Sequence, residues 1–162
     1  MGVEIEHKFL VKRELLPKKL PPGKTILQGF LCAEPVVRVR LLGKREAFLT
    51  IKGRGLRVRA EFEYPIPCAD AKELLKLCGS RTILKVRRQI GRFEVDEFMG
   101  RHSGLWLAEL ELKDARARLP KLPAWVGKDV TSDKRYANVN LANSKCKMQN
   151  AKKQRRTDGY QF

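Results

Sequence analysis

The sequence predicts a mainly β fold of the α+β class, in which an antiparallel sheet has one charged face and a few helices lie at its periphery. Three observations support this prediction. Charged and apolar residues alternate with a period of two in stretch after stretch, as strands with one wet and one dry face require. Few stretches have the features of helices. The length of 162 residues and the hydrophobic content of 43% suit one domain with its own core.

The first expected strand begins close to the N-terminus. Glu4, Glu6 and Lys8 are spaced two residues apart, and Ile5 and Phe9 occupy alternate positions. Because every second side chain of a strand points to the same face, these two acids and one ammonium group are expected side by side.

Further stretches alternate in the same way, and most of them have a charged face of a single sign. The aligned acids are Glu4, Glu6, Glu61, Glu63, Glu94, Asp96, Glu109 and Glu111. The aligned bases are Lys8, Arg38, Arg40, Lys52, Arg57, Arg59, Lys85 and Arg87. The solvated face of an antiparallel sheet explains such a pattern in one strand. Because nearly every aligned position is ionisable and the signs are segregated between strands, the pattern favours a binding or catalytic site.

The two kinds of strand have complementary chemistry. Carboxylates bind hard divalent cations through oxygen, and guanidinium and ammonium groups hold phosphate oxygens. A metal-bound polyphosphate uses both. The formal net charge of +17 also favours an anionic partner such as phosphate, nucleic acid or an acidic membrane surface, without choosing among them.

Two stretches predict helices, and both are expected at the periphery of the sheet. Residues 69–79 combine apolar side chains at helical spacing with Gly79, a residue type that ends helices. In residues 130–142, Thr131 and Asp133 are helix-capping types that precede apolar residues.

The cysteines, the histidines and the ends of the chain restrict the class of protein further. Four cysteines without a CxxC pair and only two histidines argue against a zinc site and a disulfide framework, so we expect reduced thiols in a cytoplasmic protein. Neither a signal peptide nor a membrane-spanning run is recognised, so no membrane partner is expected. Residues 1–142 are expected to form the domain. Residues 143–162 carry six lysines and arginines against one aspartate, which predicts a flexible basic tail with weak affinity for polyanions.

An ordered set of motifs resembles one protein family. Glu4, Glu6 and Lys8 form an ExExK motif, which is followed in order by QGFL, RVRL, LTIKG, EVDEF, GLWLAELEL and YANVNLA. The set resembles the CYTH group of triphosphate tunnel metalloenzymes over about residues 3–142. This resemblance implies a closed eight-stranded antiparallel β-barrel that forms a charged tunnel, and closure would leave no exposed sheet edge.

The resemblance also implies Mg²⁺ or Mn²⁺ as cofactor and roles for the aligned residues. The implied metal ligands are Glu4, Glu6, Asp96, Glu109 and Glu111. The implied substrate-binding residues are Lys8, Arg38, Arg40, Lys52, Arg57, Arg59, Lys85 and Arg87. The implied catalytic residues are Lys8, Glu61, Glu63 and Lys85. For Glu94 and the acids at positions 61, 63 and 96, three roles stay open: binding a second metal, orienting water, or neutralising neighbouring arginines.

The implied activity is metal-dependent hydrolysis of inorganic triphosphate (tripolyphosphate) to diphosphate and phosphate. Attack by water is expected because no Ser-His-Asp triad is recognisable and the cysteines lie outside the charged stretches. Two alternatives remain open. The first is action on an organic triphosphate, as a thiamine triphosphatase, a nucleoside triphosphatase or a class IV adenylate cyclase. The second is a non-catalytic module that binds polyphosphate or RNA. The oligomeric state is not predicted.

Overall fold

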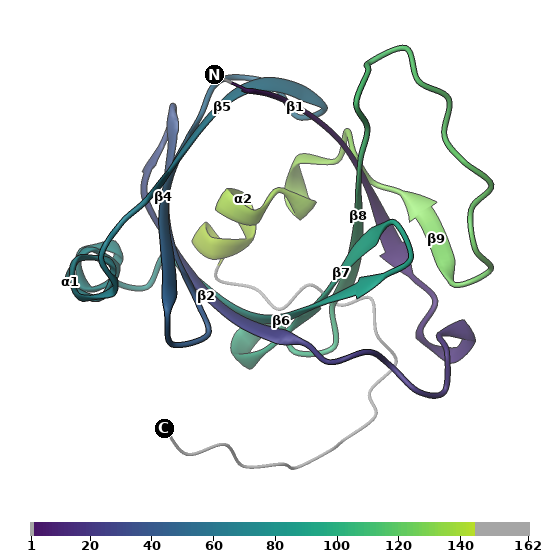
Figure 1. Cartoon of the computed structure of the whole chain (residues 1–162), viewed down its shortest axis with the longest axis horizontal. Coiled ribbons are helices and arrows are strands. Elements are labelled where there is room, and N and C mark those ends of the chain that lie inside the picture. Colours follow the sequence, from purple (N-terminus) through teal and green to yellow (C-terminus); the bar gives the residue numbers. More distant parts are fainter. Residues whose placement is uncertain (1, 145–162) are drawn as a thin grey trace.

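The computed structural model of the chain describes residues 2–144, and within them nine antiparallel strands form one sheet that closes on itself. The strands are β1 (Gly2–Val11), β2 (Lys24–Ala33), β3 (Val36–Leu42), β4 (Glu46–Lys52), β5 (Val58–Pro65), β6 (Thr82–Ile90), β7 (Phe93–Phe98), β8 (Trp106–Glu111) and β9 (Val126–Asp129). Their order is β5-β4-β3-β2-β6-β7-β8-β1-β9, and pairing of β5 with β1 closes an eight-stranded ring (Figure 1). The predicted barrel is confirmed.

Strand β1 is the seam of the barrel. One of its edges pairs with β8 from Glu6 to Leu10. Its other edge pairs first with β5, from Gly2 to Ile5, and then with β9, at Phe9 and Val11. Because β9 takes over where β5 ends, both edges of β1 have backbone partners along most of the strand.

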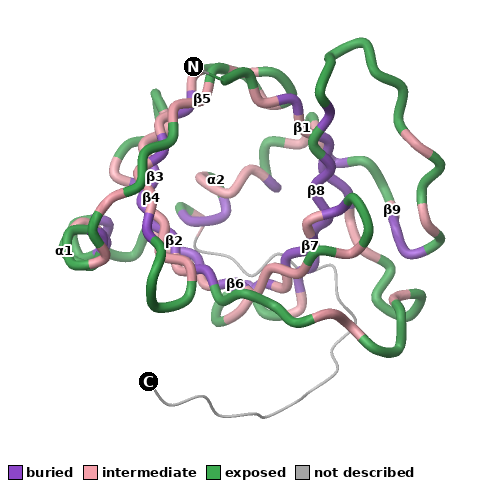
Figure 2. The backbone as a smooth tube through the Cα atoms, viewed as in Figure 1, coloured by how far each residue is buried: buried purple, intermediate pink, exposed green. Residues whose placement is uncertain are grey.

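Two apolar clusters lie against the outer wall of the barrel. One contains Phe9, Phe93 and Trp125, which belong to β1, β7 and the segment before β9. The other lies under helix α1 (Cys68–Cys78), which packs on β2, β3 and β4. Both clusters sit outside the ring, so the inward positions of the strands are free for charged side chains. Figure 2 shows the buried residues along the strands and exposed residues mainly in the connections.

Helix α1 confirms the first predicted helix within one residue at each end. It ends at Gly79, whose φ of 58° lies in the left-handed region that glycine adopts without strain. A second glycine allows the helix to approach the sheet. A Cβ atom added to Gly29 on β2 would lie 2.6 Å from Cys78 Sγ, so a larger residue at this position would push the helix outward.

The second predicted helix exists but is not peripheral. It is divided into a 3₁₀ turn, η3 (Lys134–Tyr136), and helix α2 (Asn138–Asn143), which lies within the ring in Figure 1. Leu141 and Ala142 pack against inward-facing apolar residues, among them Phe30 and Leu107. One end of the barrel interior is therefore apolar and filled by α2, a feature that the alternating charges did not predict.

Side chains from the short helix η2 (Gly100–His102) fix the end of α2. His102 Nε2 donates a hydrogen bond of 2.8 Å to the carbonyl oxygen of Leu141, and Arg101 Nη2 donates to the carbonyl oxygen of Ala142. These donors satisfy carbonyl groups that a helix end leaves without intrahelical partners. The remaining short helix, η1 (Arg13–Leu15), follows β1.

Within residues 2–144, none of the helices has the length and apolar character needed to cross a lipid bilayer. Helix α2 ends at Asn143, just beyond the predicted domain boundary at 142. The predicted basic tail lies, from residue 145 onward, outside the described residues.

Candidate active site

The barrel encloses a cavity of about 370 Å³ that is lined mainly by charged side chains. The described acids that line it are Glu4, Glu6, Glu61, Glu63, Glu94, Glu109, Glu111 and Asp133. The described bases that line it are Lys8, Arg38, Arg40, Lys52, Arg59, Arg87 and Arg92. Most of the residues that the sequence aligned on one charged face therefore meet in one cavity.

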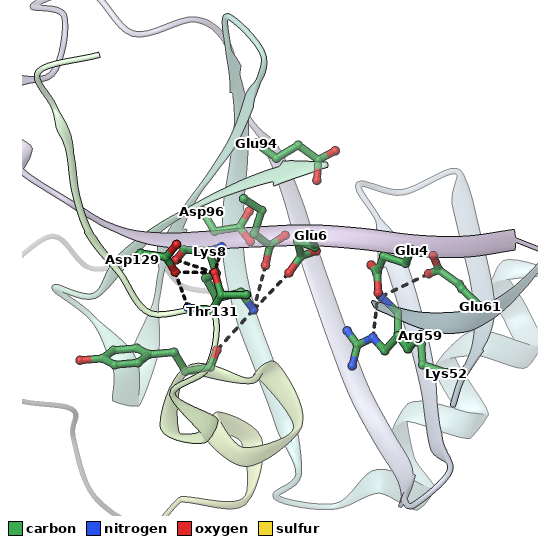
Figure 3. Close-up of polar contacts among 12 residues, drawn as sticks. Glu4, Glu6, Lys8, Lys52, Arg59, Glu61, Glu94, Asp96, Asp129 and Thr131 are labelled. Atoms are coloured by element: carbon green, nitrogen blue, oxygen red, sulfur yellow. Dashed lines mark hydrogen bonds and ion pairs between the residues drawn. The ribbon is translucent and has the colours of Figure 1, made fainter. Parts of the chain in front are cut away.

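Lys8 is the centre of a first cluster, near the end of the barrel that α2 fills (Figure 3). Its Nζ lies 3.3 Å from Glu109 Oε1 and 3.5 Å from Glu6 Oε1, and it donates a hydrogen bond of 3.4 Å to the carbonyl oxygen of Tyr136. Burial opposes the charged form of Lys8, but Glu109 and Glu6 raise its pKa above the usual value. Lys8 thus stays charged and joins two carboxylates to the segment that precedes α2.

Glu4 is the centre of a second cluster, which Figure 3 also shows. Glu4 Oε1 lies 2.5 Å from Lys52 Nζ, and Glu4 Oε2 accepts a hydrogen bond of 2.8 Å from Arg59 Nε. Lys52 Nζ also lies 3.2 Å from Glu61 Oε1. Burial alone would raise the pKa of Glu4, but Lys52 and Arg59 lower it below its usual value.

A third cluster pairs two guanidinium groups with one carboxylate. Arg38 Nη2 and Arg40 Nη2 donate to Glu63 Oε2 at 3.4 and 3.1 Å. Burial and the neighbouring Arg40 lower the pKa of Arg38 to about 10. Since one carboxylate faces two cations, this cluster has a net positive charge, which suits a phosphate group.

Arg87 connects the acids on the opposite wall. Its Nη2 lies 2.6 Å from Glu109 Oε2, and its Nη1 pairs with Glu94. Its Nε and Nη2 donate to both oxygens of Asp96, at 2.6 and 2.7 Å. Burial opposes the charge of Arg87, but Asp96 and Glu109 raise its pKa well above the usual value. Arg87 thus lines the cavity as a permanent cation.

Lys85 and Asp96 do not line the cavity, which corrects the roles expected for them. Asp96 is 0% exposed, and Lys85 is 1% exposed, with its Nζ 2.5 Å from Asp96 Oδ2. The oxygens of Asp96 are already occupied by donors from Lys85 and Arg87, so they do not suit a metal ion. The ammonium group of Lys85 is held in the barrel wall by Asp96 and is not among the groups that line the cavity. The two residues form a buried ion pair behind Arg87.

Arg57 also lies outside the cavity. It precedes the start of β5 at Val58 and is exposed, and its Nη2 donates to the carbonyl oxygen of Ala115 at 3.2 Å. The strand alternation begins only at β5, so the spacing of two between positions 57 and 59 does not bring both side chains to one face. Arg57 instead lines, with His7 and Lys128, a neighbouring depression that shares the segment around Thr131 with the cavity.

Two acids of the cavity have too little positive charge around them. Glu6 and Glu111 are direct partners across β1 and β8. Burial, together with Glu109 and Glu4, raises the pKa of Glu6 to about 7. Burial, together with Glu4, Glu61 and Glu94, also raises the pKa of Glu111, and no cation of residues 2–144 forms an ion pair with it. Like charges in directly opposed positions repel, and a bound cation would remove this repulsion.

The acids predicted to bind metal do not all converge on one point of the cavity. In residues 2–144, no three side chains of His, Cys, Asp or Glu converge closely enough to hold a metal ion. The reason is visible in the first two clusters, where Glu109 and Glu4 are held by lysine and arginine side chains. The carboxylates of the cavity provide the oxygen ligands that hard cations require, but some of these carboxylates point toward lysine and arginine side chains.

Several cavity residues were not predicted from the sequence. Arg92 lines the cavity from the turn between β6 and β7, and no acid of the described residues forms an ion pair with it. Asp133 and Asn138 line the cavity from the segment around α2. Residues in turns and loops have no periodic pattern that shows which of them face a barrel interior. The sequence therefore carried no specific signal for Arg92.

The comparisons with known proteins agree with this geometry. The chain is 41% identical over 149 residues to the inorganic triphosphatase of Acetivibrio thermocellus, covering 87% of this chain and 94% of that protein. It is 35% identical over 155 residues to the inorganic triphosphatase of Nitrosomonas europaea, covering 86% of this chain and 96% of that protein.

Similarity extends to the three-dimensional structure. A crystal structure of an inorganic triphosphatase superposes with a TM-score of 0.63 at 32% identity and covers 90% of this chain and 98% of its own. No protein-family model matches the chain. At these identities, over nearly the whole of both curated relatives, the chain belongs to the family of inorganic triphosphatases.

Proposed function

We propose that this protein hydrolyses inorganic triphosphate to diphosphate and phosphate inside the barrel, with Mg²⁺ or Mn²⁺ as cofactor. The observation that carries the proposal is a single cavity lined by basic side chains, which suit phosphate oxygens, and by carboxylates, which suit a hard divalent cation. The proposal agrees with the names of the two curated relatives. It includes membership of the CYTH group of triphosphate tunnel metalloenzymes, which the ordered motifs suggest.

The charge balance of the cavity supports a metal requirement. Among the described residues, eight carboxylates and seven cationic side chains line it, which is a formal charge of −1. A polyphosphate is itself strongly anionic, so side chains alone would leave the occupied cavity with a large excess of negative charge. A divalent cation bound with the substrate offsets this excess.

The acids that suit the cation are Glu6 and Glu111, with Glu4 and Glu109 close by. Burial and neighbouring carboxylates raise the pKa values of Glu6 and Glu111, and the one ion pair that the described residues form with either acid is that of Glu6 with Lys8, which Glu109 shares. Glu4 and Glu109 would join them by exchanging a lysine or arginine partner for the metal, which frees those cations for phosphate. The chemistry that Mg²⁺ or Mn²⁺ supplies at such a site is neutralisation of phosphate oxygens and of the charge that develops on the leaving oxygen.

The basic residues of the cavity are proposed to hold the phosphate chain. Arg38 and Arg40 offer guanidinium groups to one phosphate, and Lys52, Arg59 and Arg87 line the path toward the acids. This arrangement fixes the substrate in line for attack by water, which is most of what phosphoryl transfer requires from a protein.

Glu61 is the better placed of the two predicted catalytic acids to orient water. Among the described residues, its carboxylate pairs with Lys52 alone, and its side chain is 25% exposed. In contrast, Glu63 Oε2 already accepts hydrogen bonds from Thr50, Arg38 and Arg40. Lys8 holds Glu6 and Glu109 in place and is proposed to contact the substrate from the end that α2 fills.

We also propose the extent of the catalytic unit and the cellular compartment. Residues up to Ser144 form the catalytic unit, and the basic residues beyond it attract polyanions weakly. The cytoplasm is the proposed compartment, because the cysteines of the described residues, Cys32, Cys68 and Cys78, are free thiols, as is usual for cytosolic proteins.

The proposal is tested by measuring phosphate release from inorganic triphosphate, ATP and thiamine triphosphate, each with Mg²⁺, with Mn²⁺ and with EDTA. The expected result is metal-dependent release with the highest kcat/KM for inorganic triphosphate. A higher kcat/KM for an organic triphosphate would favour the alternative substrates. Binding of triphosphate without turnover under all conditions would favour a non-catalytic module.

A further inference from the structure

Thr50 is a fully buried polar residue in the wall of the cavity for which the proposed function provides no role. It lies on β4, directly opposite Arg38 on β3 and directly opposite Glu63 on β5. Its exposed fraction is 0%. The three side chains therefore form a row across three neighbouring strands, with the hydroxyl group in the middle.

The hydroxyl group of Thr50 makes two hydrogen bonds with opposite roles. Thr50 Oγ1 donates to Glu63 Oε2 at 2.8 Å and accepts from Arg38 Nη2 at 3.1 Å. The bond to Glu63 is the shortest that the described residues make to this carboxylate, since the arginine donors lie at 3.1 and 3.4 Å. A hydroxyl group carries one donor and two acceptor lone pairs, so it can donate to a carboxylate and accept from a guanidinium at once.

This pair of bonds decides where the Glu63 carboxylate lies. Glu63 has a third of its side chain exposed to the cavity, whereas Arg38 is buried. Without the bond from Thr50, the carboxylate could turn into the cavity, where it would repel a phosphate group. Held against the wall, it neutralises only part of the charge of Arg38 and Arg40, so the cluster keeps a net positive charge for the substrate.

We propose that Thr50 is a positioning residue for triphosphate, whose hydroxyl group holds Glu63 against the barrel wall and so keeps Arg38 and Arg40 available to phosphate. The assignment rests on the proposed function of the cavity as a triphosphate site. Thr50 does not contact the substrate, because it is fully buried behind the two arginines.

If Thr50 positions Glu63 in this way, loss of its hydroxyl group should weaken substrate binding and leave the rate at saturation nearly unchanged. Thr50→Val keeps the branched shape of the side chain and removes the hydroxyl group, so the packing of β4 is preserved. Because the hydroxyl acts on phosphate-binding arginines and not on the metal-binding acids, the loss falls on KM and on the dissociation constant. The rate at saturation depends on the carboxylates around Glu6, which Thr50 does not touch.

The experiment compares Thr50→Val with Thr50→Ser, which restores the hydroxyl group, and with Thr82→Val. Thr82 is a matched control, because it is a half-buried threonine on β6 whose side chain makes no described polar contact. Calorimetric titration with inorganic triphosphate in EDTA gives the dissociation constant without turnover, and steady-state assays with metal give KM and kcat. Thermal unfolding of each variant measures stability.

Thr50→Val should weaken binding and raise KM by about five- to tenfold, the scale of one ordinary hydrogen bond, because the hydroxyl acts on phosphate only through its neighbours, and kcat should change by less than about twofold. Thr50→Ser and Thr82→Val should stay within about twofold of the wild type. Unchanged binding by Thr50→Val, or equal weakening by Thr50→Ser, would overturn the assignment. Equal loss of kcat and binding would overturn it too, since it would make Thr50 a structural residue.

The role of Thr50 can be tested even if one variant does not fold or if the protein is not a triphosphatase. If Thr50→Val fails to fold, Thr50→Ser and Thr50→Ala give the same comparison, and the serine variant alone should bind normally. If the wild-type protein releases no phosphate from any triphosphate, the proposed function fails, while the titrations in EDTA still decide whether Thr50 controls anion binding.

Discussion

Glu6 and Glu111 lie directly opposite one another on β1 and β8, and both line the cavity. Their positions bring two carboxylates together where the nearby cations, such as Lys8, are shared with Glu109. Burial, reinforced by neighbouring carboxylates, raises the pKa values of both groups. The pair is therefore the part of the cavity where an added divalent cation changes the electrostatic energy most.

Neutral variants of this pair should lose activity and keep their fold. Glu6→Gln and Glu111→Gln each remove the charge of a proposed metal ligand while preserving size, so metal-dependent turnover should fall by about a hundredfold or more, the scale that electrostatic groups of active sites contribute. Titration of turnover with Mg²⁺ measures the effect. Glu97→Gln is the control, because Glu97 pairs with Arg88 outside the cavity. Turnover at the wild-type rate by either Gln variant would remove that acid from the metal site.

The raised pKa of Glu6 predicts a dependence of stability on pH in the metal-free protein. The pKa is about 7 in the folded state and 4.5 for the unperturbed group, so between these values the folded state holds a proton that the unfolded state releases. The unfolded state then binds fewer protons, and the contribution of Glu6 to the free energy of unfolding falls as pH rises from about 5 to about 8.

This dependence is isolated by comparing Glu6→Gln with the wild type in EDTA. The free energy of unfolding of the variant, minus that of the wild type, should be more positive at about pH 8 than at about pH 5. Denaturant titrations at both pH values provide the difference. A difference that is the same at both would show that Glu6 titrates normally.

Two arginines spaced two residues apart should differ in their effect on binding. Arg59 lines the cavity and bonds to Glu4, whereas Arg57 is exposed on the outside. Arg59→Ala should weaken triphosphate binding by about 1.5–3 kcal/mol, the value of a charge-assisted hydrogen bond. Arg57→Ala should leave the dissociation constant unchanged. Similar losses in the two variants would contradict the placement of Arg57 outside the cavity.

The buried pair behind Arg87 should matter for stability. Asp96→Asn removes the charge that pairs with Lys85 and with part of the Arg87 guanidinium, so the free energy of unfolding should fall by about 3–5 kcal/mol, as for other broken buried ion pairs. Glu73→Gln, which breaks the exposed pair with Lys76 on α1, should cost no more than about 1 kcal/mol. Equal stability of the two variants would argue against a buried role for Asp96.

The basic tail provides a further test. Truncation after Ser144 keeps the contacts of α2 with Arg101 and His102 and removes residues 145–162. Hydrolysis of inorganic triphosphate at saturating metal should be preserved, and retention on heparin should weaken most at low salt, because cations on a chain release counterions from polyanions. Loss of turnover with unchanged thermal stability would show that these residues contribute to the site.

The sequence predicts the barrel wall well because side chains alternate between the inner and the outer face along each strand. Glu4, Glu6 and Lys8 alternate with apolar residues, and the structure places the three inside and Phe9 outside. Period two assigns residues to a face but carries no information on depth along the barrel. It therefore aligned Lys85 with Arg87, although only Arg87 lines the cavity.

Features that depend on tertiary packing, on strand boundaries or on strand register could not be predicted from the alternation of charged and apolar residues. The inward residues Phe30 and Leu107 are apolar because α2 fills that end of the barrel, and this packing joins segments distant in sequence. Arg57 precedes the start of β5, a boundary that the spacing of charges does not reveal. The row through Thr50 depends on the register of three strands, which only pairing in three dimensions determines.

The reaction proposed for this protein is metal-dependent cleavage of inorganic triphosphate in the cavity around Glu6. Phosphorus NMR of the reaction with Mg²⁺ measures it most directly, because it follows substrate and both products in one sample. Phosphate and diphosphate are expected in equal amounts with Mg²⁺, neither is expected in EDTA, and Glu6→Gln is expected to form neither at a comparable rate. Equal rates with Mg²⁺ and in EDTA, or no cleavage by the folded wild-type protein with either Mg²⁺ or Mn²⁺, would contradict the proposed reaction.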